Sequence, residues 1–149
     1  MTLKIVNALR IISIIILIFV FFISYAGLPE QVLILLDEAS NPTTYLEKNF
    51  YFYGALSLLI ITNLLFFLLA NILVKSISTR AQLSGKYLNV LAIITNIFFA
   101  VALTFLGILN GQENFDYASY SPFIYTSLGL FVVWAVSFLV SLAKSKKTV

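Results

Sequence analysis

Four long apolar stretches constrain this chain more than any other feature of its sequence. They cover residues 9–27, 51–74, 88–109 and 122–143, and apart from Arg10, near the start of the first, none contains an Asp, Glu, Lys or Arg. A helix of roughly 20 apolar residues crosses a hydrocarbon core of about 30 Å. Backbone groups inside a bilayer must be satisfied within their own segment, so each stretch is expected to be a helix. The sequence therefore predicts an all-α integral membrane protein, a bundle of four transmembrane helices.

Composition narrows the possible functions. The chain is 61% hydrophobic and 10% charged, whereas a soluble domain is roughly half apolar and a quarter charged. It contains neither cysteine nor histidine, and so lacks thiols and the usual ligands for zinc, haem or copper. All its carboxylates lie between the apolar stretches, away from any base or nucleophile that could complete a catalytic set. We expect no enzyme, no cofactor, no metal site and no nucleic-acid partner.

The charges predict an orientation. All basic residues except Lys48 lie before or at the start of the first stretch, between the second and third, or after the fourth: Lys4, Arg10, Lys75, Arg80, Lys86, Lys144, Lys146 and Lys147. The acidic residues lie in the two other connections: Glu30, Asp37, Glu38, Glu47, Glu113 and Asp116. Basic segments stay cytoplasmic, so the inner loop 75–87, the basic tail 144–149 and both termini should lie inside. The loops 28–50 and 110–121 should lie outside.

The first stretch has one alternative interpretation. Its basic start, with the small residues Ser24 and Ala26 at its end, also fits a cleavable signal peptide, whose removal would leave three spans and an external N-terminus. The charge pattern of the remaining chain is consistent with four spans. We therefore favour a single membrane domain over residues 1–149, in a cell membrane and specifically the bacterial cytoplasmic membrane, in contact with the lipid bilayer.

Polar residues inside the apolar stretches predict how two of the helices pack. If the second and third helices form an antiparallel hairpin, residues at equal depth face each other along one stripe. The polar pairs at equal depth are Asn63 with Asn96, Asn71 with Asn89, Ser57 with Thr104, and Asn49 with Asn110. An unpaired amide in hydrocarbon costs several kcal/mol, whereas two facing asparagines can each donate and accept. The sequence therefore predicts polar contacts between these two helices.

The same side chains allow a functional interpretation. Together with Thr62 and Thr95 they could line a path for an ion or a small solute between the second and third helices. A coupling ion or a gate usually requires a charged residue near the middle of the membrane, and the two stretches contain none. We therefore favour interhelical contact over a solute path.

The segment between the first two helices, LPEQVLILLDEASNPTTYLEK at 28–48, is too long for a simple turn. We expect a short structured outer loop in which the apolar residues 33–36 lie on the outer ends of the helices. Thr44 and Glu47 have the spacing of a capping box for the second helix. Lys48, the basic residue on the outer side, is expected to pair with Glu30, Asp37 or Glu38, or else to remain solvated.

The fourth predicted helix carries the chain's single tryptophan midway along its length. An indole N–H inside a membrane needs a hydrogen-bond partner, so Trp134 is expected to pack within the bundle rather than to contact a ligand. Small residues on the same helix would let a neighbouring helix or a second copy of the chain approach closely.

The outer segment also resembles a known family, the domain of unknown function 1648, which forms the N-terminal region of Sdp-type immunity proteins and of related bacterial membrane proteins. The residues that match its motif are Leu28, Pro29, Glu30, Val32, Pro42, Tyr45 and Lys48, while Asp37 replaces the usual asparagine. The chain departs from the motif where Leu33 replaces a proline, Leu35 the histidine, Leu36 an aromatic residue and Ser40 the glycine. The resemblance implies an outer cap on a helical membrane bundle, without the chemistry of the histidine.

These features favour a non-catalytic, small multi-pass membrane protein. We expect an accessory subunit or an immunity-like or sensor-like protein that binds another membrane protein, a second copy of itself or an outer-side ligand through the loop 28–48. The alternative is a small oligomeric transporter or channel with an Asn/Thr-lined path between the second and third helices.

Overall fold

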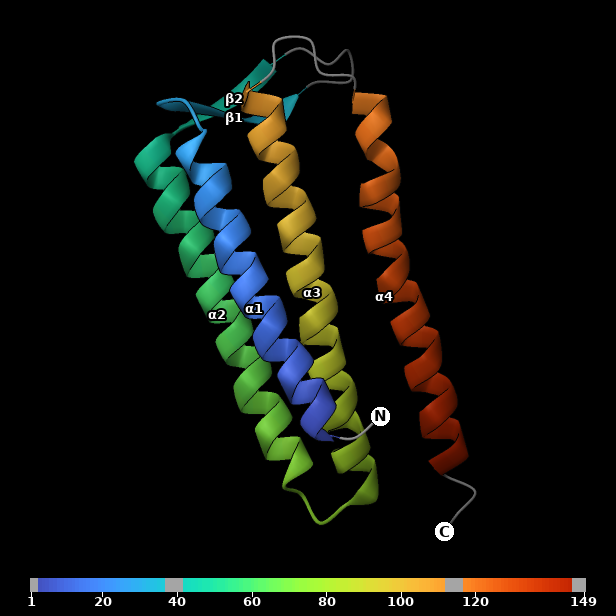
Figure 1. Ribbon diagram of the computed structural model, residues 1–149. Coiled ribbons are helices and arrows are strands. Elements are labelled where there is room, and N and C mark those ends of the chain that lie inside the picture. Colours follow the sequence, from blue (N-terminus) through green and yellow to red (C-terminus); the bar gives the residue numbers. More distant parts are fainter. Residues whose placement is uncertain (1–2, 37–41, 112–116, 146–149) are drawn as a thin grey trace.

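The computed structural model describes residues 3–36, 42–111 and 117–145. Its elements follow in the order α1 (Leu3–Ala26), β1 (Gln31–Leu36), β2 (Pro42–Glu47), α2 (Lys48–Val74), α3 (Thr79–Gly111) and α4 (Tyr117–Ser145). Four of the described helices are long and apolar enough to cross a membrane, which confirms the predicted four-helix architecture. The start of α1 and the end of α4 lie at the same end of the bundle, opposite the two strands (Figure 1).

The helices extend beyond the predicted apolar spans. The largest difference is at α3, which begins at Thr79 rather than at residue 88. Most of the segment 75–87, expected to be a loop, is therefore helical, because charged and polar helix formers can continue a helix that hydropathy alone ends too early. The remaining connection is short, and Gln82 Nε2 donates to Ser76 O across it at 2.9 Å.

Helix α3 occupies the centre of the arrangement and packs against α1, α2 and α4. Figure 1 shows α4 lying along α3, on the side away from α2. The hydrophobic core lies toward the end that carries the strands and consists of Leu17, Phe21, Leu28, Val32, Tyr51, Leu59 and Leu103. The predicted neighbours α2 and α3 do pack together, but α1 shares the same central helix.

The outer segment is an antiparallel hairpin of β1 and β2, so the prediction of an all-α fold is wrong there. Val32 pairs with Leu46 and Leu33 with Tyr45, and the register shifts on either side of Leu35. Strand pairing satisfies backbone groups that neither flanking helix can reach. The apolar run is buried unevenly: the adjacent residues Val32 and Leu33 are both buried, whereas Leu35 is exposed.

The start of α2 also differs from the prediction. Thr44 lies within β2, and Glu47, at the N-cap position, makes no side-chain capping hydrogen bond. Instead, the backbone N–H of Lys48 donates to Glu30 O at 2.9 Å. The hairpin itself thus satisfies one of the free N–H groups at the start of the helix, and no capping box is needed.

Candidate functional site

The predicted contact between Asn63 and Asn96 is present. Asn63 Nδ2 donates to Asn96 Oδ1 at 2.9 Å and also lies 3.1 Å from Leu59 O. Asn96 is 2% exposed, and its own amide donates to Ser13 Oγ of α1 at 3.0 Å. The two asparagines therefore join three helices, where the sequence analysis expected two.

Arg10 makes a second group of interhelical contacts beside the pair of Asn63 and Asn96. The residue is 8% exposed. Its Nη1 donates to Asn89 Oδ1 at 2.8 Å, and Nη2 donates to the backbone oxygen of Asn63 at 3.2 Å. It also lies 5.3 Å from the centre of the Phe67 ring, a cation–π distance. A single arginine thus connects α1 with both α2 and α3.

We call Arg10, Ser13, Asn63, Asn89 and Asn96 the polar cluster. Ser13 Oγ donates to Arg10 O at 2.7 Å, and Asn89 Nδ2 donates to Gly85 O at 3.2 Å. Interhelical hydrogen bonds in membranes contribute only about 0.6 to 2 kcal/mol each. The cluster therefore sets the register of the three helices more than it holds them together.

The charge of Arg10 is not neutralised within the described residues. Both of its hydrogen-bond acceptors are neutral amide oxygens. The described acidic residues, Glu30 and Glu47, lie in the hairpin segment at the other end of the bundle. Among described residues, two buried side-chain atoms have no hydrogen-bond partner, Arg10 Nε and Asn63 Oδ1. Buried charges are normally paired, so this part of the cluster is incomplete in charge and in hydrogen bonding.

Two adjoining cavities reach Arg10. A groove of about 480 Å³ runs between α1 and α2 from Arg10 and Asn63 to Phe21 and Phe22, and its other lining residues are apolar. A smaller cavity of about 200 Å³ also includes Arg10 and adds the polar residues Asn7 and Asn71. The two share Arg10, Ile14 and Phe67 as lining residues, so they adjoin each other around these three residues.

The other predicted polar pairs do not form within the described residues. Asn71 lines the smaller cavity, while Asn89 is bonded to Arg10. Ser57 is exposed on α2, and Thr104 Oγ1 donates to Ala100 O at 2.9 Å within its own helix. Only Asn63 and Asn96 meet as predicted, because α3 turns Asn89 and part of Asn96 toward α1 rather than α2.

Asn110 has a different role from the one predicted. Its expected partner Asn49 is exposed. Asn110 Oδ1 instead accepts from the backbone N–H of Leu33 at 2.7 Å, and Nδ2 donates to Leu33 O at 3.1 Å and to Leu106 O at 2.9 Å. The side-chain amide thus bonds to β1 as a neighbouring strand would and holds the hairpin on α3.

Lys48 also holds the outer segment, but not through an ion pair with Glu30. Its Nζ donates to Leu28 O at 2.6 Å and lies 5.0 Å from the centre of the Tyr25 ring. The other two expected partners, Asp37 and Glu38, lie outside the described residues. A backbone carbonyl and an aromatic face therefore take the place of the predicted carboxylate.

The other residues of segment 28–48 that match the family motif differ in how far they are buried. Leu28 and Val32 are buried beneath the hairpin. Those that are exposed at its surface are Pro29, Glu30, Pro42 and Tyr45, while Asp37 lies outside the described residues. The motif thus supplies both the attachment of the hairpin and part of its outward face.

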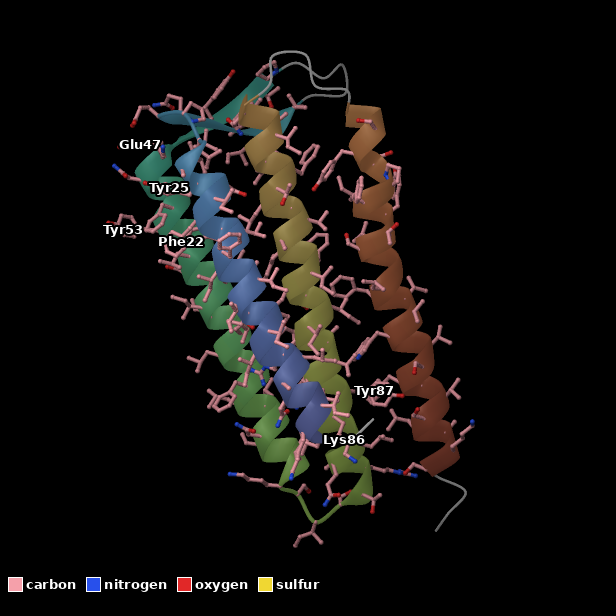
Figure 2. All side chains as sticks on the ribbon, in the orientation of Figure 1. Phe22, Tyr25, Glu47, Tyr53, Lys86 and Tyr87 are labelled. Atoms are coloured by element: carbon pink, nitrogen blue, oxygen red, sulfur yellow. The ribbon has the colours of Figure 1, made fainter. Side chains whose placement is uncertain are left out.

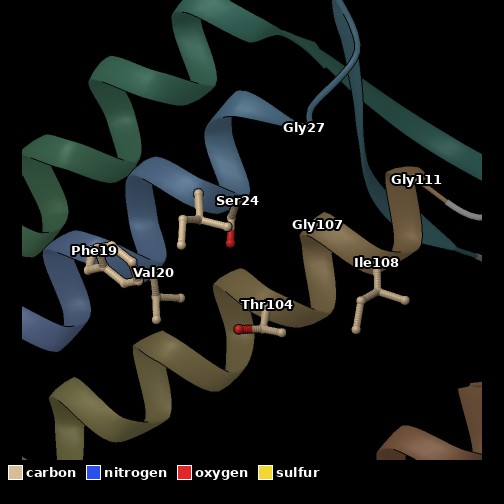
Figure 3. A pocket seen from close by; sticks show the side chains of 9 residues that line it. Phe19, Val20, Ser24, Gly27, Thr104, Gly107, Ile108 and Gly111 are labelled. Atoms are coloured by element: carbon tan, nitrogen blue, oxygen red, sulfur yellow. The ribbon is translucent and has the colours of Figure 1, made fainter.

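A further cavity of about 410 Å³ lies between the hairpin-side halves of α1 and α3. Figure 3 shows Ser24 and Thr104 on its two sides, with Gly107 beside them. No charged residue lines it. A Cβ atom at Gly107 would lie at an ordinary 3.6 Å from Ser24, so the cavity shows no requirement for glycine there.

Helix α4 joins the bundle through aromatic and hydroxyl groups. Trp134 Nε1 donates to Tyr87 O at 2.9 Å, so the indole has the partner within the bundle that the sequence required. The Tyr87 hydroxyl, which points toward α4 in Figure 2, lies 3.1 Å from Ser137 Oγ and 2.6 Å from Ser141 Oγ. The small residues of α4 thus serve this contact.

Comparison of the chain with protein-family models, with curated proteins and with solved structures finds no match. The resemblance of residues 28–48 to the domain of unknown function 1648 stays a prediction.

Sequence reasoning missed the role of Arg10, which it assigned to the cytoplasmic edge of the first helix. One signal was present: Arg10 and Ser13 are spaced three residues apart, which places both on one face of a helix. Polar side chains on that face require hydrogen-bond partners from other helices, and the asparagines of the second and third helices could provide them.

Proposed function

We propose that this protein is a non-catalytic four-span protein of the bacterial cytoplasmic membrane, with both termini cytoplasmic. It acts as an accessory or immunity-like subunit that binds another membrane protein or an outer-side ligand through the hairpin segment 28–48. The polar cluster serves to hold three helices in register beneath that segment.

The membrane location is supported by the outward faces of the helices. Large apolar side chains such as Ile15, Phe19 and Ile72 are more than half exposed, and continuous apolar surface of this extent is unstable in water. The distribution of basic and acidic residues supports the orientation. Tyr53 and Glu47 project from the end of the bundle that carries the hairpin (Figure 2), where a membrane interface would place them.

The observation that carries the binding proposal is the attachment of the hairpin. Asn110 holds Leu33 by two hydrogen bonds, Lys48 holds Leu28, and Val32 is fully buried. All of β2 except Leu46 is nevertheless exposed. A rigid element that presents exposed side chains binds a partner with a smaller loss of conformational entropy than a flexible loop does.

The alternative, a transporter or channel, has less support. A solute path along α2 and α3 would require access to the asparagines at mid-depth. Asn96 is almost fully buried, and its amide oxygen and nitrogen are both bonded to side chains of the bundle. This closed contact favours a structural role for the pair Asn63 and Asn96.

The proposal is tested by photo-crosslinking in native membranes. A benzophenone amino acid in place of Tyr45, on β2, should crosslink to one discrete protein or ligand. The same group in place of Tyr53, which is similarly exposed on α2, should crosslink chiefly to lipid. The same products from both positions would contradict a binding role for the hairpin.

A further inference from the structure

We propose that the groove between α1 and α2 binds an anionic phospholipid, with the phosphate at Arg10 and one acyl chain along the groove. The inference rests on the proposed membrane location, but not on the role of the hairpin. It adds a ligand site whose charged end, at Arg10, lies away from the hairpin and toward the start of α1.

The two cavities together have the chemistry of an amphiphile. The smaller one, beside Asn7, Arg10 and Asn71, offers a cation and two amides, which are the groups that bind a phosphate and its neighbouring polar atoms. The larger one is apolar apart from Arg10 and Asn63. Ligand sites generally occupy about 300 to 1,000 Å³, and the groove, at about 480 Å³, falls within that range.

Charge provides the specificity. Arg10 as a whole residue is more than nine-tenths buried, and its guanidinium faces two neutral oxygens and keeps Nε without a hydrogen-bond partner. Both buried side-chain atoms that lack a partner, Arg10 Nε and Asn63 Oδ1, belong to residues lining the groove. A phosphate beside Arg10 would neutralise the charge of the guanidinium.

The dimensions fit a lipid of one leaflet. The α1 residues that line the groove run from Arg10 to Phe22, which is about 18 Å at 1.5 Å per residue. Half of a hydrocarbon core is about 15 Å. The predicted apolar span of the first helix begins at residue 9, so the groove begins at Arg10 near one membrane surface and ends somewhat beyond the middle, at Phe22.

The basic residues near Arg10 indicate which leaflet of the membrane would supply the bound lipid. Arg10 lies toward the end of the bundle where Lys4, Lys75 and Lys86 are found, and Figure 2 shows Lys86 at that end. Under the proposed orientation this is the cytoplasmic side. Anionic lipids are attracted to basic cytoplasmic segments and to basic pockets between transmembrane helices, so an anionic phospholipid is the occupant that the surroundings favour.

The first test compares lipids on the purified full chain. The protein in mild detergent is mixed with equal amounts of phosphatidylglycerol, phosphatidylcholine with the same acyl chains, and palmitate, and the retained lipid is measured by native mass spectrometry. We expect phosphatidylglycerol to be retained about tenfold more than phosphatidylcholine, as a charge-assisted contact requires. Equal retention of the two phospholipids, or preferential retention of palmitate, would overturn the proposal.

Substitutions locate the site. Arg10→Gln should lower phosphatidylglycerol retention about tenfold, whereas Arg80→Gln, which makes the same charge change at an exposed position, should leave it unchanged. Leu64→Trp should block the groove that Leu64 lines. Leu65→Trp is the matched control, because Leu65 lies outside that lining and the two leucines are exposed to 52% and 53%.

The pair Leu64→Trp and Leu65→Trp keeps the test valid if Arg10→Gln fails to fold, because neither substitution removes a core contact. Retention that is unchanged by Leu64→Trp, or lowered equally by Leu65→Trp, would overturn the groove as the site. The measurement requires no outer partner, so its outcome is independent of the crosslinking result at Tyr45.

Discussion

The side-chain amide of Asn110 forms hydrogen bonds with both backbone polar groups of Leu33, accepting from its N–H at 2.7 Å and donating to its carbonyl at 3.1 Å. This is the bonding of a β-sheet neighbour, supplied by one side chain at the end of α3. It protects part of the open edge of β1, and an exposed edge would otherwise be free to pair with other chains.

Asn110→Leu should therefore loosen the hairpin without unfolding the bundle. Loss of the two bonds leaves buried backbone groups unsatisfied, at a cost of about 1 to 3 kcal/mol. Hydrogen exchange of the Leu33 amide should accelerate accordingly. Asn49→Leu, at the exposed position once expected to pair with Asn110, serves as the control, and equal acceleration in both variants would contradict the assignment.

The contact between Asn63 and Asn96 should be measurable as a coupling energy. Each asparagine also has another bond, so a double-mutant cycle with Asn63→Leu and Asn96→Leu is needed to isolate the pair. We expect a coupling of about 0.6 to 2 kcal/mol in unfolding from mixed micelles. Additive effects of the two substitutions would show that the contact contributes nothing to stability.

Gly85 should tolerate no side chain. A Cβ atom there would lie 2.7 Å from Val74 Cγ2 and 2.8 Å from the Val74 backbone nitrogen, so α2 and α3 would have to separate. Gly85→Ala is expected to destabilise the protein by about 1 to 3 kcal/mol, although alanine favours helix formation.

Gly54→Ala provides the matched comparison, because a Cβ atom there would meet nothing within 4 Å. It should be neutral or stabilise α2 by up to about 1 kcal/mol through helix propensity. Thermal unfolding of the two variants in the same detergent separates close packing from propensity, and similar shifts in both would contradict the close approach at Gly85.

The single tryptophan should report the docking of α4. Tyr87→Phe keeps the ring contact with Phe138 but removes the hydroxyl that lies near Ser137 and Ser141. We expect Trp134 fluorescence to shift to the red and α4 to exchange faster. Tyr53→Phe, on the far side of the bundle, should change neither quantity.

The sequence predicted the helices because their apolar length leaves a bilayer-spanning chain little choice. It also predicted the depth of Asn63 and Asn96, since rise per residue is fixed in a helix. It could not predict rotation about the helix axis, which depends on how three helices pack together. For that reason Ser13 was missed as the partner of Asn96, and Thr104 was assigned to the wrong neighbour.

The hairpin was missed for a different reason. The segment QVLILL lacks the alternation that marks a half-buried strand, and one of its contacts in the fold is with Asn110, which lies 77 residues away from Leu33. A short apolar run of this kind is compatible with several conformations, and tertiary contacts decide among them.

The order of synthesis gives the polar cluster one more consequence. Arg10 leaves the ribosome first, while its acceptors follow 53 and 79 residues later. Until α3 has been inserted, the nascent chain holds a cation that none of its finished helices can solvate fully. The first helix can therefore reach its final packing only when the bundle is complete. A chain truncated before Asn89 should be recognised by quality-control proteases.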